Sequence, residues 1–183
     1  DDAAAALETL VPQDIAGLGL LKQRYAFFTN DAGGLLDDLM VTRREGDLFL
    51  VVNAGCKDAD IAHTADGAAR AAFSNSGQLC ISIERIYVEQ DVFEAFLARF
   101  VAATAALDLR VGMGWDGDVG TLVSADQLAK VSGQVEDARA RGARVRAGGR
   151  PRPDLAPYAY EPTILTGVEP GMACYREETF GPV

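Results

Sequence analysis

Cysteine and histidine, the main zinc ligands and cross-linking residues of proteins, are scarce in this chain. Its 183 residues include three cysteines and one histidine, and no two cysteines have a C-x-x-C spacing. An odd number of dispersed cysteines argues against a disulfide framework, and so few thiol and imidazole groups argue against a zinc site. We therefore expect no metal centre and a reducing, cytoplasmic environment.

Long apolar runs and excess positive charge are also absent. The longest apolar segments, such as residues 48–52, are far too short to cross a bilayer. The start, two aspartates followed by four alanines, lacks the basic residues and long apolar centre of a signal peptide.

The chain carries excess negative charge: Lys and Arg number 17 against 27 Asp and Glu, a formal net charge of −10. Nucleic acids and anionic membranes are therefore disfavoured as partners.

The stretch that ends at Cys80 carries the clearest chemical signal. Residues 73–80 are Phe-Ser-Asn-Ser-Gly-Gln-Leu-Cys, so the cysteine follows a polar turn that would keep it near solvent and near backbone N–H groups. A cysteine without such a context is more often a small buried hydrophobe. The octet resembles the Phe-x-Asn-x-Gly-Gln-x-Cys signature of the aldehyde dehydrogenase superfamily, in which the cysteine is the catalytic nucleophile. Residues 81–88 are most similar to its succinate-semialdehyde dehydrogenase branch.

Segments toward the C-terminus extend this resemblance. Residues 119–124 are similar to a Gly-Pro-Leu-Ile-Ser segment of the family, although Thr121 stands where proline is usual. Residues 177–183, Glu-Glu-Thr-Phe-Gly-Pro-Val, match a highly specific family motif. By resemblance Glu178 binds the nicotinamide ribose and Phe180 contacts the nicotinamide, whereas an isolated glutamate would be a solvated carboxylate. The resemblance implies NAD- or NADP-dependent oxidation of a small aldehyde, such as succinate semialdehyde, through a cysteine thiohemiacetal.

The first third of the chain resembles a different enzyme. Residues 7–15, 24–30, 33–43 and 50–56 are similar to the aminomethyltransferase, or T protein, of the glycine cleavage system. In that family the second aspartate of Gly-Gly-x-x-Asp-Asp is the folate-site carboxylate. The resemblance therefore gives this role to Asp38 and names tetrahydrofolate as the cofactor of this segment. From the local pattern alone, the two aspartates would equally well be turn residues of a hairpin.

The two resemblances meet between about residues 57 and 64, where both families carry an Asp-Ala-Asp step. We interpret the chain as a chimera, either a recombinant gene or an artefact of sequence assembly. Residues 1–60 would be a truncated aminomethyltransferase-like segment and residues 61–183 a truncated aldehyde dehydrogenase catalytic-domain segment. The expected fold class is α/β: a partial aldehyde dehydrogenase catalytic domain, with a sheet flanked by helices, preceded by a partial α+β folate-binding-like segment.

Local patterns predict the main elements. Residues 24–53 are interpreted as two short strand regions, at residues 25–28 and 48–53, with turn residues at 30–34 and 45–47. Residues 58–73 are rich in alanine, the strongest helix former. We predict a strand at residues 85–89. Ser124, with Gln127 three residues later, has the pattern of a capping box that begins a helix. The strand and helix alternation after residue 85 predicts a parallel or mixed sheet.

One glycine pattern is rejected as a cofactor motif. Residues 112–117 formally satisfy G-x-G-x-x-G, which binds dinucleotides where it leads from a strand into a helix. Here Gly117 is followed by an aspartate and begins no predicted helix. The segment is therefore interpreted as a turn.

Several groups that the implied reaction requires have no counterpart in the sequence. No Glu-Leu-Gly-Gly segment precedes Cys80, so the family's general base is missing, and the T-protein-like segment stands where the dinucleotide-binding domain is expected. His63 is a weak replacement, because a lone helix histidine is more often solvated. The family forms homo-oligomers through strands that would follow residue 183. We expect no activity from the chain alone, and a folate-dependent aminomethyltransferase and an inactive chimeric fragment remain as alternatives.

Overall fold

The chain is divided into two compact units. The computed structural model describes residues 2–112, 114 and 117–183, so part of the glycine segment at residues 112–117 lies outside the described residues. Unit 1 comprises Asp1–Ala68 and Arg85–Phe100, and unit 2 comprises Ala69–Glu84 and Val101–Val183. Helix α2, Lys57–Phe73, therefore contributes its first turns to unit 1 and its end to unit 2. Helices and strands are mixed in both units, consistent with the expected α/β class.

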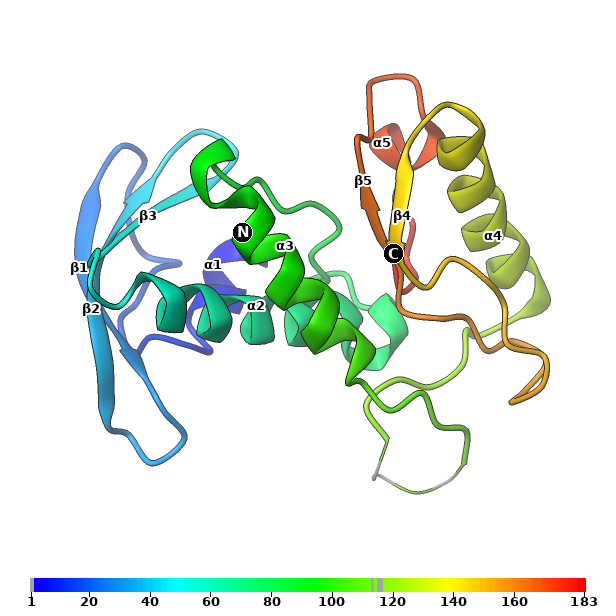
Figure 1. Cartoon of the computed structure of the whole chain (residues 1–183), viewed down its shortest axis with the longest axis horizontal. Helices are drawn as coiled ribbons and strands as arrows, with labels where there is room; N and C mark the ends of the chain where they lie inside the picture. The colour runs from blue at the N-terminus through cyan, green and yellow to red at the C-terminus, as the bar shows by residue number, and fades with distance from the viewer. Residues whose placement is uncertain (1, 113, 115–116) are drawn as a thin grey trace. The chain divides into compact units, whose positions relative to one another are not determined.

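Unit 1 is built on a three-stranded antiparallel sheet, β1 (Gln23–Thr29), β2 (Leu35–Arg43) and β3 (Leu48–Val52), in the order β1-β2-β3 (Figure 1). The turn between β1 and β2 is held by the Asn30 side chain, whose Oδ1 accepts from the N–H groups of Ala32 and Gly34 at 3.0 and 2.9 Å. The two predicted strand regions, now β1 and β3, and this turn are confirmed, whereas β2 lies where no strand was predicted. Asp37 and Asp38 lie within β2, which corrects the alternative that placed them in a turn, because residues 30–34 make the reversal.

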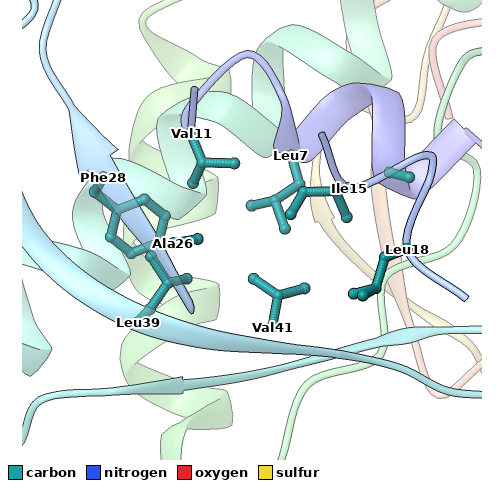
Figure 2. Packing of buried hydrophobic residues seen from close by; sticks show 9 residues of the cluster. Leu7, Val11, Ile15, Leu18, Ala26, Phe28, Leu39 and Val41 are labelled. Carbon is teal, nitrogen blue, oxygen red and sulfur yellow. The ribbon is translucent and has the colours of Figure 1, made fainter. Parts of the chain in front are cut away.

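The core of unit 1 follows from the two-residue period of the strands. Ala26 and Phe28 of β1, and Leu39 and Val41 of β2, lie on one face of the sheet and are buried. Figure 2 shows this face covered by side chains from helix α1 (Asp2–Leu7) and from the chain that follows it. The covering side chains are Leu7, Val11, Ile15 and Leu18.

Helix α3, Gln90–Ala105, begins after a segment that was expected to be a strand. Its apolar side chains Phe96, Leu97 and Phe100 are buried, as the helical spacing of this stripe requires. The predicted strand at residues 85–89 is wrong, since this segment has irregular structure. A strand requires a neighbour for its backbone hydrogen bonds, and no described strand pairs with these residues.

Unit 2 contains helix α4 (Ala125–Ala140), strands β4 (Arg144–Ala147) and β5 (Ile164–Thr166), and the short helix α5 (Ala173–Arg176). Its core includes Leu122, Val131, Val135 and Tyr160. The Ser124 Oγ accepts from the Gln127 N–H at 3.2 Å, which confirms the predicted helix start. β4 and β5 are antiparallel, so the prediction of a parallel or mixed sheet is wrong for the described strands. The connecting residues 148–163 contain no crossover helix, and an antiparallel return needs none.

Among the described residues, no helix has both the length and the apolar character needed to cross a bilayer.

Candidate active site around Cys80

The chain leaves helix α2 through a left-handed turn that leads to Cys80. Asn75, Ser76 and Gly77 have φ angles of 51°, 59° and 66°, a conformation that non-glycine residues rarely adopt. A Cβ on Gly77 would lie 2.1 Å from the carbonyl oxygen of Gly181, so this position requires glycine for its contact as well as its φ angle. The turn therefore packs backbone against backbone on the C-terminal motif. Cys80 follows it with an exposed side chain.

Two side chains of this turn hold the loop before α4. The Ser76 Oγ accepts from the Gly120 N–H at 3.1 Å. The Gln78 Nε2 donates to the Thr121 carbonyl at 3.1 Å, and its Oε1 accepts from the Val123 N–H at 2.9 Å. The glutamine of the Gly-Gln-x-Cys motif thus acts as a bridge between two loops. These bonds span more than 40 residues of sequence and fix the segment that carries the cysteine.

Two further side chains hold the C-terminal motif. The Glu84 Oε1 accepts from the N–H groups of Thr179 and Phe180, both at 2.9 Å. The Gln127 Nε2 donates to the carbonyl groups of the same two residues, at 2.9 and 2.7 Å. In a complete capping box the Gln127 side chain would bind the backbone N–H of Ser124. Here the Gln127 N–H donates to Ser124, but the Gln127 side chain binds Thr179 and Phe180 instead, so only half of the predicted capping box is formed. Sequence reasoning missed Glu84, since no local pattern links it to a segment 95 residues away.

The predicted cofactor residues lie on this held segment. Glu178 is exposed and Phe180 is half-buried, while Thr179 between them is buried. Cys80 follows the turn whose Gly77 contacts Gly181, so the structure links the segment that carries Cys80 to the segment of Glu178 and Phe180. Within the part of the chain that the structure describes, no hydrogen bond from the Cys80 N–H to a protein acceptor is found.

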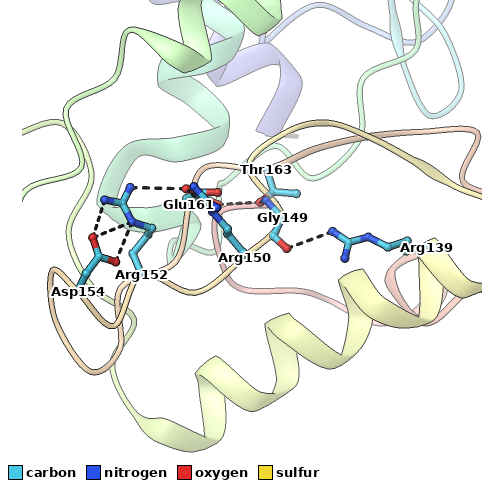
Figure 3. Close-up of polar contacts among 7 residues, drawn as sticks. All are labelled: Arg139, Gly149, Arg150, Arg152, Asp154, Glu161 and Thr163. Atoms are coloured by element: carbon cyan, nitrogen blue, oxygen red, sulfur yellow. Dashed lines mark hydrogen bonds and ion pairs between the residues drawn. The ribbon is translucent and has the colours of Figure 1, made fainter.

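Polar contacts hold the chain between Gly149 and Thr163 (Figure 3), and Thr163 also binds the C-terminal motif. The Thr163 Oγ1 accepts from the Gly149 N–H at 2.9 Å, and the Thr163 N–H donates to the Pro182 carbonyl at 2.8 Å. Arg150 and Arg152 both pair with Glu161, and Arg152 also pairs with an aspartate two residues later. The positive charges of Arg150 and Arg152 are therefore compensated within the loop.

The second candidate site, around Asp38 in unit 1, is also hydrogen-bonded. The Asn53 Nδ2 donates to the carboxylates of Asp37 and Asp38, at 3.0 and 2.8 Å. A hydrogen bond to Asp38 is the main cause that raises the pKa of Tyr25. Asp38 thus has partners on β1 and on the segment after β3, neither of which the sequence pattern indicated.

Asp37, next to it, faces a second carboxyl group. Asp60 of α2 is only 3% exposed, and the Oδ2 atoms of Asp37 and Asp60 are both buried without a donor. Burial, then a hydrogen bond and the charge of Asp37, raise the pKa of Asp60 to about 6. A hydrogen bond between these two carboxyl groups requires a proton on one of them, and the raised pKa makes Asp60 the group that carries it at mildly acidic pH. Burial and the neighbouring carboxylates, chiefly Asp37, also raise the pKa of Cys56.

His63 lies in unit 1 and packs edge-on against Phe28, with ring centroids 5.2 Å apart. Its Nε2 is buried and has no hydrogen-bond partner. This contact gives the histidine a packing role in the unit 1 core.

Comparisons with known proteins find matches to two families. A model of the aldehyde dehydrogenase family matches residues 51–183, and a model of the GCVT N-terminal domain matches residues 1–83, so the two matches overlap at residues 51–83. A protein of Mycolicibacterium smegmatis that is named as an NADP(+) succinate-semialdehyde dehydrogenase is 52% identical over 134 residues, which cover 73% of this chain and 25% of that protein.

Solved structures give the same result. The crystal structure of succinate-semialdehyde dehydrogenase from Burkholderia pseudomallei matches with a TM-score of 0.61 and 36% identity, over 67% of this chain and 25% of that chain. The NAD-dependent aldehyde dehydrogenase of Sinorhizobium meliloti matches with a TM-score of 0.64 and 32% identity, over 68% of this chain and 25% of that chain. The chain thus spans about a quarter of the length of these relatives. Since the family model covers well over half of its residues, the chain belongs to the aldehyde dehydrogenase family.

Proposed function

We propose that unit 2 carries the nucleophile and part of the cofactor site of an NADP- or NAD-dependent aldehyde dehydrogenase, with Cys80 as the nucleophile. The observation that supports this most strongly is the fastening of the Cys80 turn to the segment of Glu178 and Phe180. A reaction that passes hydride from a thiohemiacetal to a cofactor needs these two segments in a fixed relation. Side chain to backbone bonds and one backbone contact supply that relation.

The residues have separate roles in this proposal. The Cys80 thiolate attacks the aldehyde carbon, and the Cys80 N–H donates to the oxygen as it becomes an oxyanion. The exposed Glu178 carboxylate accepts from the hydroxyls of a ribose, and Phe180 contacts the attached ring. A bound nicotinamide dinucleotide supplies the hydride acceptor. Both residues fit this group, because an exposed carboxylate and a half-buried aromatic ring flank the buried Thr179.

The proposed substrate is a small acidic aldehyde such as succinate semialdehyde. Its support comes from the names of the relatives that match 67–73% of the chain. Arg150 and Arg152 are poor receptors for the substrate carboxylate, because Glu161 and Asp154 already compensate their charges. The carboxylate-binding residue of this substrate is therefore outside this loop.

Selective alkylation of the thiols tests the role of Cys80. With iodoacetamide at neutral pH, mass spectrometry should show Cys80 labelled before Cys56 and Cys174. Cys80 is exposed, whereas burial and carboxylates raise the pKa of Cys56 and so reduce its thiolate fraction. Succinate semialdehyde should protect Cys80 by forming the thiohemiacetal, and succinate, which has no aldehyde, should not. Fastest labelling of Cys56, or equal protection by both compounds, would contradict the proposal.

A second function, folate-dependent aminomethyl transfer, is favoured by one observation, the GCVT N-terminal domain match to residues 1–83. In this proposal the carboxylate of Asp38, which Asn53 orients, binds the pterin. Because a single carboxylate cannot enclose a pterin, we expect calorimetric titration with tetrahydrofolate to show weak binding. A low-micromolar dissociation constant that Asp38→Asn abolishes would instead make folate binding the main function of unit 1.

A further inference from the structure

The backbone of Thr179 and Phe180 is held from both sides. Glu84 accepts from both N–H groups, and Gln127 donates to both carbonyl groups, with all four distances between 2.7 and 2.9 Å. We call this pair of side chains the Glu84–Gln127 clamp. Glu84 follows Cys80 by four residues, and Gln127 lies in the first turn of α4.

The Glu84–Gln127 clamp does more than provide hydrogen-bond partners for buried backbone groups, because it also holds an unfavourable backbone conformation at Phe180. Phe180 has a φ angle of +50°, and a bulky residue stays in this region only where its surroundings impose it. Thr179 is 2% exposed, so its backbone groups need protein partners. The clamp is therefore what keeps Phe180 in an unfavourable conformation.

The conformation of Phe180 determines where its neighbours point. A peptide that relaxed to a negative φ angle at Phe180 would redirect the phenylalanine ring and the chain on either side of it. Glu178 and Phe180 would then no longer present a ribose and a nicotinamide in one orientation. The same relaxation would leave the contact between Gly77 and Gly181 unsupported, because Gly181 directly follows Phe180.

We propose that Glu84 is a positioning residue of this site: it holds Thr179 and Phe180 so that a nicotinamide bound by Glu178 and Phe180 faces the Cys80 thiol. This inference rests on the proposed function. It assigns to Glu84 no contact with substrate or cofactor. Its action passes through two backbone N–H groups, and Gln127 completes the hold from α4.

Three substitutions separate the reach of Glu84 from its charge. Glu84→Gln keeps the length and one acceptor oxygen but removes the charge. Glu84→Asp keeps the charge but is one methylene shorter, and Glu84→Ala removes both. Glu169→Gln, an exposed carboxylate elsewhere in unit 2, is the matched control for loss of charge. A clamp that acts by geometry predicts that the glutamine variant resembles the original chain and that the aspartate variant resembles the alanine variant.

Amide hydrogen exchange in the full chain tests the clamp without any cofactor. Glu84→Ala and Glu84→Asp should speed exchange at Thr179 and Phe180 by roughly 10- to 100-fold, the range for loss of a hydrogen bond to a charged group. Glu84→Gln should change it by less than about fivefold, and Glu169→Gln should leave it unchanged. If Glu84→Ala unfolds unit 2, the exchange rates of Glu84→Gln and Glu84→Asp at Thr179 and Phe180 still show whether Glu84 holds this backbone. Equal exchange in all variants would overturn the clamp.

Titration with NADP⁺ tests the positioning role. Glu84→Ala and Glu84→Asp should weaken binding by about tenfold or more, with Glu84→Gln close to the original chain and Glu169→Gln identical to it. Binding that all three Glu84 variants retain would overturn the positioning role even where exchange confirms the hydrogen bonds. Absence of NADP⁺ binding in the original chain would instead contradict the proposed function and the positioning role that rests on it, while the exchange result would still decide the clamp.

Discussion

Polar groups have different kinds of partner in the two units, as the surroundings of Cys80 in unit 2 and those of Asp37 in unit 1 show. Around Cys80, side chains reach backbone groups across long stretches of sequence, and Gln78, Glu84 and Gln127 each bind two of them. Around Asp37, a partly buried carboxyl group neighbours the buried carboxyl group of Asp60, and this pairing and burial raise the pKa of Asp60 to about 6. The first arrangement fixes the backbone, and the second makes Asp60 bind a proton more tightly. The four predictions that follow test this contrast.

The first prediction concerns turnover by a chain that holds the Cys80 segment in place but lacks a general base. With succinate semialdehyde and NADP⁺, the 183-residue chain should give no sustained turnover, because the sequence offers no counterpart of the family's general base for thioester hydrolysis. Loss of a general base costs about 10²- to 10⁴-fold in rate. Stopped-flow absorbance of reduced cofactor is the measurement, with Cys80→Ser as the control. Continued turnover that disappears in Cys80→Ser would show that this chain has a group that replaces the missing base.

The backbone contact at Gly77 should dominate the stability of the Cys80 region. Gly77→Ala adds a Cβ that would lie 2.1 Å from the Gly181 carbonyl oxygen, at a φ angle of 66°. Overpacking and an unfavourable φ angle together should lower the free energy of unfolding of unit 2 by about 2–5 kcal/mol. Urea unfolding followed by amide exchange in unit 2 measures this.

A glycine in the same unit provides the control. Gly133 lies within α4, and a Cβ there meets no atom within 4 Å. Gly133→Ala should therefore stabilise the chain by up to about 1 kcal/mol, because alanine is the better helix former. Destabilisation of similar size in both variants would break the argument from the close contact.

The carboxyl pair should make unit 1 sensitive to pH. The folded-state pKa of Asp60, about 6, lies above its ordinary value, so the folded chain binds the proton more tightly than the unfolded chain. The free energy of unfolding should therefore fall by roughly 1–3 kcal/mol as pH rises from about 4 to 6, and then level off. Asp60→Asn, with an amide that always donates to Asp37, should remove this loss.

The measurement is urea unfolding at a series of pH values between 4 and 8, with the difference between variants isolating Asp60 from other titrating groups. Asp66→Asn, an exposed aspartate in the same helix, is the control and should retain the pH dependence of the original chain. An unchanged pH profile in Asp60→Asn would show that the two carboxyl groups do not share a proton.

The smallest expected effect concerns Gln78. Gln78→Ala removes two hydrogen bonds to the loop before α4 and should cost about 1–2 kcal/mol in urea unfolding of unit 2. Gln23→Ala, which removes an exposed side-chain bond to Thr42, should cost little. Equal losses would mean that the bonds around Cys80 stabilise no more than surface contacts, which would weaken the contrast between the two regions.

Local signals in the sequence were sufficient for some features and insufficient for others. The helix start at Ser124 and the turn at residues 30–34 depend on hydrogen bonds between residues two to four positions apart, so the sequence pattern predicts them. Residues 85–89 have the composition of a strand, but strand formation depends on a partner that the pattern cannot show. The roles of Glu84 and Asp60 depend on residues 95 and 23 positions away, which only the fold brings close.

The contact between Gly77 and Gly181 has a consequence for the redesign of this protein. Two backbones that touch without side chains have no part that can be resized, so variation in one loop cannot be compensated in the other. A library aimed at new substrates should therefore leave both glycines unchanged. Diversity belongs instead at Leu79, Ile81 and Val123, whose side chains are exposed next to the held backbone. The two glycines are thus expected to tolerate no substitution, whereas the three exposed positions beside them can vary.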